Sequence, residues 1–153
     1  MTISIRQAAV QDAAAIAPLF DAYRQFYQQP PAIDAAHAFI SERLERGQSV
    51  IFVAEDQGNM LGFCQLYPTF CSVAAAPIFT LYDLFVTPDA RTSGAGRQLM
   101  LAAESHARAA GAVRLDLTTA KDNLRAQSVY EALDWVRDEV FYTYNKALDP
   151  VSA

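Results

Sequence analysis

A loop with two glycines and two arginines carries the strongest chemical signal in this sequence. The segment 91–97, Arg-Thr-Ser-Gly-Ala-Gly-Arg, lies between a predicted strand and a predicted helix. Glycine lets a backbone turn sharply, and the first amides of a helix lack internal partners and carry partial positive charge. With Arg91 and Arg97 beside them, these amides predict a site for an anion such as pyrophosphate. The spacing also fits a turn that only joins strand to helix, and it matches neither the Walker loop nor the dinucleotide fingerprint.

A second signal is the lone carboxylate of Asp83 within the almost wholly apolar run 78–86. Such a run is typical of a strand buried on both faces, and a carboxylate there needs a partner or a task. The residues alone leave three readings open. Asp83 binds a substrate ammonium, relays the proton of that group through water, or satisfies backbone donors.

Aromatic residues gather in two segments of the chain. Tyr23, Phe26 and Tyr27 recur at helical spacing, and three more aromatic residues lie within 141–144. Aromatic faces bind ammonium groups by cation–π contact, which contributes roughly 0.5–2 kcal/mol. The same stripes also suit a hydrophobic core or a subunit interface.

The composition limits the class of protein. With 153 residues, of which 52% are hydrophobic and 19% charged, the chain suits one domain over residues 1–153. The net charge of −5 argues against a nucleic-acid binder, which normally shows a basic patch. No secretory signal or membrane-spanning stretch is visible, and Cys64 and Cys71 lack metal-site spacing. We therefore expect a cytoplasmic protein with no metal, no nucleic-acid partner and no membrane partner.

Hydrophobic periodicity divides the chain into alternating strands and helices. Strands are predicted at 3–5, 49–54, 61–67, 78–86 and 113–118, with one or two more over 136–148, and helices between residues 12 and 30 and at 35–46, 94–110 and 122–133. Helices that separate strands, together with a hairpin at Gly58, indicate an α/β fold with a sheet of mixed direction.

Two motifs resemble those of a known family. Residues 86–96 are similar to motif A of the GNAT acyltransferases, whose pattern is Arg/Gln-x-x-Gly-x-Gly/Ala after a strand that ends in Val. Residues 123–135 are similar to the second block of that family, Asn-x-x-Ala-x-x-x-Tyr followed by Leu-Gly-Phe or Leu-Gly-Trp. With the N-terminal helices and the hairpin, the resemblance covers nearly the whole chain. It implies a GNAT-like acyl-CoA N-acyltransferase fold, with a mixed, mostly antiparallel sheet of six or seven strands flanked by about four helices.

The resemblance also implies that acetyl-CoA lies where the fourth and fifth strands separate, with CoA as the product. The implied cofactor contacts come from a strand, the loop and the second block: Leu84, Phe85, Val86, Arg91, Thr92, Ser93, Gly94, Ala95, Gly96, Arg97, Asn123, Ala126 and Tyr130. Tyr130 would protonate the departing thiolate as general acid, since a phenol with a pKa of about 10 suits that task. The helical spacing of Tyr130 also fits a core aromatic residue.

Two positions depart from the family motifs. Thr92 replaces a glycine that commonly follows the arginine, which narrows the freedom of the loop. Asp134 replaces the glycine of the Leu-Gly-Trp segment. Aspartate tolerates left-handed backbone angles better than most residues, so we expect the turn at Asp134 to survive.

A finer resemblance concerns the acceptor side of the site. The strand that holds Asp83 is similar to its counterpart in spermidine/spermine and thialysine acetyltransferases, but Tyr82 stands where those enzymes carry Glu. The segment around Tyr23 resembles one in Hpa2-like acetyltransferases, which act on polyamines and basic protein tails. The predicted acceptor-binding residues are therefore Tyr23, Phe26, Tyr27, Tyr82 and Asp83.

Together these signals predict an N-acetyltransferase that moves the acetyl group of acetyl-CoA directly to a primary amine in a ternary complex. The expected acceptor is small and cationic, like a polyamine or a diamino acid, and the predicted catalytic residues are Tyr130 and Asp83. Two alternatives stay open: an acetyltransferase of protein N-termini or lysine tails, and a catalytically silent acyl-CoA-binding regulatory module. The missing Glu at position 82 favours the silent module. The resemblance also makes a homodimer an expectation, because members of the family often pair through terminal strands.

Overall fold

The computed structural model describes residues 2–149, and these divide after Thr118 into two compact units. The elements of the first unit, in chain order, are β1 (Ser4–Gln7), α1 (Ala13–Phe26), α2 (Ile33–Glu45), β2 (Val50–Asp56), β3 (Asn59–Cys71), β4 (Ala76–Val86), α3 (Ala95–Ala109) and β5 (Leu115–Asp116), with 3₁₀ turns at Val10–Asp12 and Pro88–Ala90. In the second unit the described residues form one helix, α4 (Leu124–Ala132).

The strands of the first unit follow one another across a single sheet in chain order, β1-β2-β3-β4-β5. Neighbouring strands from β1 to β4 are antiparallel, whereas β5 runs parallel to β4. Between β2 and β3 the chain turns within two residues, Gln57 and Gly58, whose φ angles are 51° and 82°. Positive φ at both positions is what a type I′ hairpin turn requires. A parallel pair needs a longer crossover, which α3 supplies between β4 and β5.

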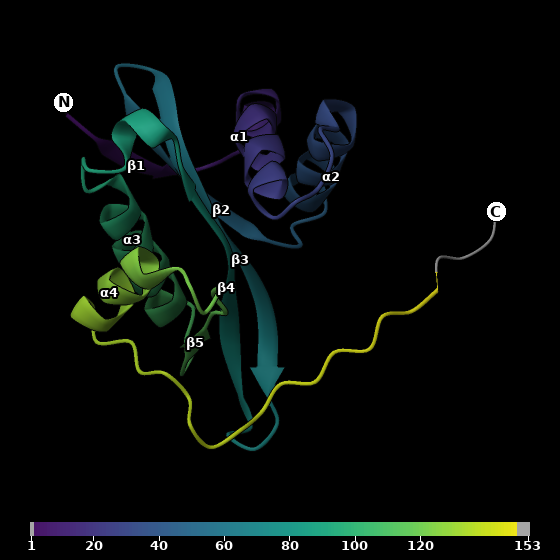
Figure 1. Cartoon of the computed structure of the whole chain (residues 1–153), viewed down its shortest axis with the longest axis vertical. Helices are drawn as coiled ribbons and strands as arrows, with labels where there is room; N and C mark the ends of the chain where they lie inside the picture. Colours follow the sequence, from purple (N-terminus) through teal and green to yellow (C-terminus); the bar gives the residue numbers. More distant parts are fainter. Residues whose placement is uncertain (1, 150–153) are drawn as a thin grey trace. The chain divides into compact units, whose positions relative to one another are not determined.

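Helices cover both faces of this sheet: α1 and α2 lie side by side on one face, and α3 lies on the other (Figure 1). Alternate residues of β3 divide between these two layers. Phe63 belongs to a fully buried core with Ile16 of α1 and Ile40 of α2. Cys64 points the other way, and its thiol donates to the Leu99 carbonyl of α3 at 3.7 Å. The period of two along a strand therefore decides which layer each β3 side chain enters.

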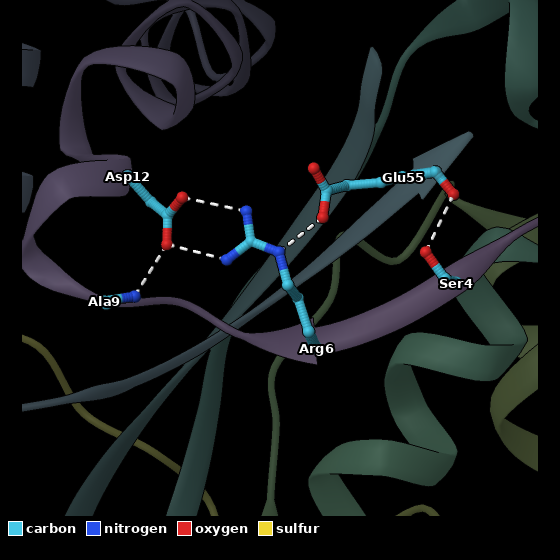
Figure 2. A network of polar contacts seen from close by, with 5 residues as sticks. All are labelled: Ser4, Arg6, Ala9, Asp12 and Glu55. Atoms are coloured by element: carbon cyan, nitrogen blue, oxygen red, sulfur yellow. Dashed lines mark hydrogen bonds and ion pairs between the residues drawn. The ribbon is translucent and has the colours of Figure 1, made fainter. Parts of the chain in front are cut away.

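Arg6 of β1 ties the start of α1 to the sheet (Figure 2). Its guanidinium makes a two-pronged ion pair with Asp12, with both N···O distances 2.8 Å, and its Nε donates to Glu55 of β2. Asp12 also accepts a hydrogen bond from the Ala9 amide at 2.7 Å. These partners stabilise the ionised carboxylate and hold the pKa of Asp12 at about 2, below its usual value. The network is structural, because it fixes the entry of the helix that carries Tyr23.

The prediction of six or seven strands is wrong for the described residues, which contain five. The strand expected at 113–118 is reduced to Leu115–Asp116, and the described residues after 135 form no strand. The apolar side chains of that last segment lie exposed: Val136, Val140, Phe141, Tyr142, Tyr144 and Leu148. Apolar and aromatic residues favour a strand because they fit a half-buried pleated surface. The composition of residues 136–149 alone therefore does not make a strand.

The other predicted elements are present with shifted ends. α1 ends at Phe26, before the prolines at 30 and 31 that were expected to terminate it, and β3 continues past residue 67 to Cys71. Within the described part of the chain, no helix is long and apolar enough to cross a membrane. The same residues contain no group of three side chains able to hold a metal ion.

Candidate active site

β4 contains an extra residue, Tyr82, opposite β3. Gln65 of β3 pairs with Asp83, but the next pair along is Leu66 with Leu81, so Tyr82 has no partner in the ladder. This arrangement is a β-bulge, which redirects side chains and is common beside functional sites. The Tyr82 side chain is 66% exposed, and the expectation that this strand is buried on both faces is therefore wrong at the bulge.

Asp83 is only 4% exposed and lies on the face of the sheet that Tyr23 of α1 reaches. Gln65 Nε2 donates a hydrogen bond to Asp83 Oδ2 at 2.5 Å, and the Ser49 hydroxyl donates to Gln65 Oε1 at 2.7 Å. Gln65 and Ser49 are also buried. A buried polar chain of three side chains therefore runs from the start of β2 to the predicted catalytic carboxyl group.

Two opposing influences act on the Asp83 carboxyl group. Burial raises its pKa, because the ionised form loses its hydration, while hydrogen bonds from Gln65 and Tyr23 lower the pKa. Burial is the larger influence, so the pKa lies above its usual value. A carboxylate with a raised pKa is better matched to proton transfer near neutral pH than an ordinary one.

Three tyrosines from three elements lie around this carboxyl group. The Tyr23 phenol donates to the Tyr82 carbonyl at 3.0 Å, and the Tyr82 ring meets the Tyr67 ring of β3 edge-on, with centroids 5.6 Å apart. Burial and the charge of Asp83 raise the pKa of both Tyr23 and Tyr67, so both phenols keep their protons. Sequence reasoning missed Tyr67 and Gln65. Their spacing of two along one strand was the available signal, because it places them on the same face.

The other two predicted acceptor residues extend this aromatic wall away from the carboxyl group. The Tyr27 ring lies 5.1 Å from that of Tyr23, and the Phe26 ring lies 5.2 Å from that of Tyr27. Phe26 and Tyr27 are about half exposed. The buried Asp21 accepts a hydrogen bond from the Ala32 amide at 2.9 Å, which fixes the loop that follows them. The helical spacing thus places Tyr23 beside the Asp83 carboxyl group, whereas Phe26 lies at the exposed end of this row of aromatic rings.

The predicted anion loop leads into the N-terminus of α3. Gly94 is the N-cap of the helix and has φ +88°, a left-handed conformation that glycine adopts without strain, as its place in the sequence predicts. The Gln98 amide donates to the Gly94 carbonyl at 3.0 Å. The amides of Gly96 and Arg97 precede that bond and therefore belong to the first turn, whose donors point out of the helix end. Together with the helix dipole they form a region of positive potential.

Ser93 and Gly96 have different parts in this loop. The Ser93 hydroxyl donates to the Ala90 carbonyl at 2.5 Å and accepts from the Ala95 amide at 3.3 Å, which closes the turn. Gly96 lies inside α3, where an added Cβ would meet Val86 at 3.7 Å, an ordinary contact. The backbone does not require glycine at position 96, so its predicted use, the close approach of a ligand, stays a prediction.

Arg91 ties the loop to the end of β4. Its Nε donates to the Val86 carbonyl at 3.0 Å, and its guanidinium carbon lies 5.6 Å from the centroid of the Phe85 ring. β5 pairs with β4 only at Phe79 and Thr80, before the bulge. Beyond the bulge, no described strand of the first unit runs along that edge of β4. Because Arg91 of the loop bonds to Val86, the predicted anion loop lies beside the end of β4, where the predicted strand contacts with the cofactor lie.

In the second unit, Asn123 is the N-cap of α4, and its side-chain oxygen accepts from the Ala126 amide at 3.2 Å. The residue predicted to contact the cofactor thus also begins the helix. Tyr130 is half-buried, and its ring lies 6.2 Å from that of Trp135, whose amide donates to the Tyr130 carbonyl at 3.0 Å. Asp134 has φ +68°, so aspartate accepts the left-handed angle expected at this turn.

Residues 15–135 match the model of the Acetyltransferase (GNAT) family. The chain is 49% identical over 142 residues to the uncharacterized N-acetyltransferase YhfO of Bacillus subtilis (strain 168), which covers 93% of this chain and 95% of that protein. A crystal structure of a probable acetyltransferase has a TM-score of 0.90 and 36% identity and covers 96% of this chain and 99% of that one. The aminoglycoside N-acetyltransferase AAC(6′)-Iy in complex with CoA has a TM-score of 0.80 at 23% identity over 96% of each chain, a likeness of fold alone.

Proposed function

The chain belongs to the GNAT acetyltransferase family, and we propose that it transfers the acetyl group of acetyl-CoA directly to a primary amine of a small cationic acceptor. Acceptor and cofactor would be bound together in a ternary complex. The observation that carries this proposal is the buried Asp83 carboxyl group with Tyr23, Tyr67 and Tyr82 around it. A carboxylate among aromatic rings has the chemistry of an ammonium site.

The first unit contains groups that fit the cofactor. The first-turn amides of α3, with the charges of Arg91 and Arg97, suit its pyrophosphate, and the edge of β4 at Leu84 and Val86 offers backbone groups to its pantetheine arm. When bound, acetyl-CoA supplies a thioester whose carbonyl carbon accepts the attacking amine. The AAC(6′)-Iy structure was solved with CoA, and its fold is like that of this chain, which supports the same cofactor here.

Asp83 has two tasks in this proposal. An alkylamine has a reference pKa of about 10.4, so only about one molecule in a thousand is neutral at pH 7, and attack requires the neutral form. The ionised carboxylate attracts the ammonium group and then accepts its proton, directly or through a water molecule. Because the partners of Asp83 are the side chains of Gln65 and Tyr23, the reading in which it serves backbone donors has less support.

Tyr82 and Tyr130 complete the proposal. The bulge presents Tyr82 at the surface, at the position where the polyamine acetyltransferases that this strand resembles carry Glu, so Asp83 takes the acidic role alone. For Tyr130 we propose the general acid that protonates the departing thiolate, on the strength of the family motif. A phenol has the proton that this step needs.

An assay of thiol release tests this function and separates it from the alternatives. The purified chain is given acetyl-CoA with polyamines, diamino acids, N-terminal peptides or lysine-tail peptides. Release that depends on polyamines or diamino acids is the expected result. Release with peptides alone would identify a protein acetyltransferase. Tight CoA binding without release across the whole panel would indicate a silent regulatory module and overturn the proposal.

A further inference from the structure

We propose that Gln65 and Ser49 are positioning residues for the acceptor, because they hold Asp83 as an oriented, ionised carboxylate. The inference rests on the proposed function, in which Asp83 attracts the acceptor ammonium. Gln65 donates to Asp83 Oδ2 and so restricts how the carboxylate can turn toward the acceptor. Ser49 acts one step further away, through Gln65.

The Gln65 amide has a defined orientation between Ser49 and Asp83. An amide has one end that donates and one that accepts, whereas an ionised carboxylate only accepts. The Gln65 NH₂ group therefore faces Asp83, at 2.5 Å, and its carbonyl oxygen faces away. That oxygen accepts from the Ser49 hydroxyl at 2.7 Å. Each bond in the chain thus has its donor on the Ser49 side, the direction that suits an ionised Asp83.

The Gln65 amide donates to either protonation state of Asp83, but the bond to the ionised carboxylate is the stronger one, because hydrogen bonds to charged acceptors are stronger than those between neutral groups. Gln65 is fully buried, so an amide left without a partner in either orientation would cost free energy. Ser49 satisfies the Gln65 carbonyl oxygen in the orientation in which the Gln65 amide donates to the carboxylate.

Hydrogen bonds from Gln65 and from Tyr23 stabilise the Asp83 carboxylate, and the other ionisable groups around it are as follows. Tyr23 from α1, Tyr67 from β3 and Cys64 from β3 all have raised pKa values and stay neutral. Tyr82 from β4 also acts on the two half-buried phenols, Tyr23 and Tyr67. From α2, Arg43 exerts its charge on the Tyr67 phenol.

The test is a carbon-13 NMR titration of the Asp83 carboxyl group in the whole chain without ligands, with its signal identified by its absence in Asp83→Asn. Gln65→Met keeps the length of the side chain and removes the donor. We expect the apparent pKa of Asp83 to rise by about one unit, a tenfold loss of ionised carboxylate below the titration midpoint. Ser49→Ala, which removes one hydroxyl, should raise the apparent pKa of Asp83 by less. Ser49→Thr, which keeps the hydroxyl, should have the wild-type pKa at Asp83.

The kinetic readout distinguishes this inference from the function on which it rests. With a cationic amine, the acid limb of kcat/KM should move to higher pH in Gln65→Met and, by a smaller step, in Ser49→Ala. If the apparent pKa of Asp83 is the same as in wild type in both Gln65→Met and Ser49→Ala, while their thermal stability is lowered, then Gln65 and Ser49 are structural residues only. That result would overturn the inference. Absence of acetyl transfer by the wild type would instead overturn the proposed function, and the titration would still show whether the pair controls Asp83.

Discussion

Gln65 and Asp83 face each other across β3 and β4 at the residue pair beside the bulge, and the Gln65 amide donates to Asp83 Oδ2 at 2.5 Å. The relationship combines the backbone pairing of two strands with a hydrogen bond between two side chains. Backbone register decides that the two residues meet, and the extra residue Tyr82 then displaces the rest of β4 relative to β3. The register thus supplies Asp83 with its partner, and the irregularity leaves Tyr82 without one in the ladder.

The first prediction concerns the pH dependence of acetyl transfer. Burial raises the pKa of Asp83 above its ordinary value of 3.8, so the carboxylate that the acceptor needs disappears at a higher pH than for an exposed aspartate. As the pH falls through that raised pKa, kcat/KM should fall about tenfold per unit. A pH profile measures this limb, and Asp83→Asn should abolish it. A limb that persists unchanged in Asp83→Asn would assign the ionisation to another group.

The second prediction compares two glycines at opposite ends of α3. Gly94 and Gly111 have φ angles of +88° and +81°, and a Cβ at either would meet no atom within 4 Å. Alanine at either position should therefore cost a similar amount of stability, about 1–2 kcal/mol, from the left-handed angle alone. Gly94→Ala should also weaken CoA binding by about tenfold, because it alters the first turn of the helix. Calorimetric titration with CoA and thermal unfolding separate the two effects. Equal CoA affinities in the two variants would remove the loop from the cofactor site.

The third prediction concerns Tyr130. Tyr130→Phe keeps the ring beside Trp135 and removes the hydroxyl, so α4 should stay folded. Loss of a general acid should lower kcat by about 10²-fold with little change in KM for the amine. Steady-state kinetics with a saturating cationic amine measure both constants. Wild-type kcat in this variant would leave Tyr130 as a packing residue.

The fourth prediction concerns acid stability. Because the folded pKa of Asp12 is lowered to about 2, its ion pair with Arg6 stabilises the fold above about pH 4, and this contribution is lost as the pH falls toward 2. Arg6 is nearly half exposed, so solvent screening limits the contribution to about 1 kcal/mol. Urea unfolding of Arg6→Met should show that loss at pH 7 and a weaker dependence on pH between 4 and 2. Arg46→Met, which breaks an exposed pair with Glu42, serves as the control and should change neither. A steeper acid dependence in Arg6→Met would contradict this account.

Local chemistry made several features predictable from the sequence. The left-handed conformation of Gly94 at the N-cap of α3 was predictable, because few other residues adopt that backbone angle without strain. Asp134 was expected to accept the angle of the glycine that it replaces, and φ +68° confirms this. The helices and the hairpin at Gly58 follow from periodicity and turn chemistry, which depend on neighbours in sequence.

Features that depend on pairing between distant segments were not predictable in the same way. The run around Tyr82 has the composition of a regular buried strand, and its bulge is set by the register with β3, which a single strand does not encode. The contact of Gln65 with Asp83 has the same origin. The prediction of a strand over residues 136–148 was wrong for a similar reason. Their apolar residues favour a strand but do not specify a partner strand.

The central claim is that the Asp83 carboxylate enables acetyl transfer to a cationic amine, and thiol release with acetyl-CoA and spermidine tests it most directly. Asp83→Asn is compared with wild type and with Asp89→Asn, which changes an exposed aspartate just beyond β4. Asp83→Asn should be at least as stable as wild type at neutral pH, because ionisation of a carboxyl group with a raised pKa destabilises the fold. The account predicts that kcat/KM falls by about 10²- to 10⁴-fold in Asp83→Asn and stays unchanged in Asp89→Asn. Wild-type kcat/KM in Asp83→Asn would contradict it.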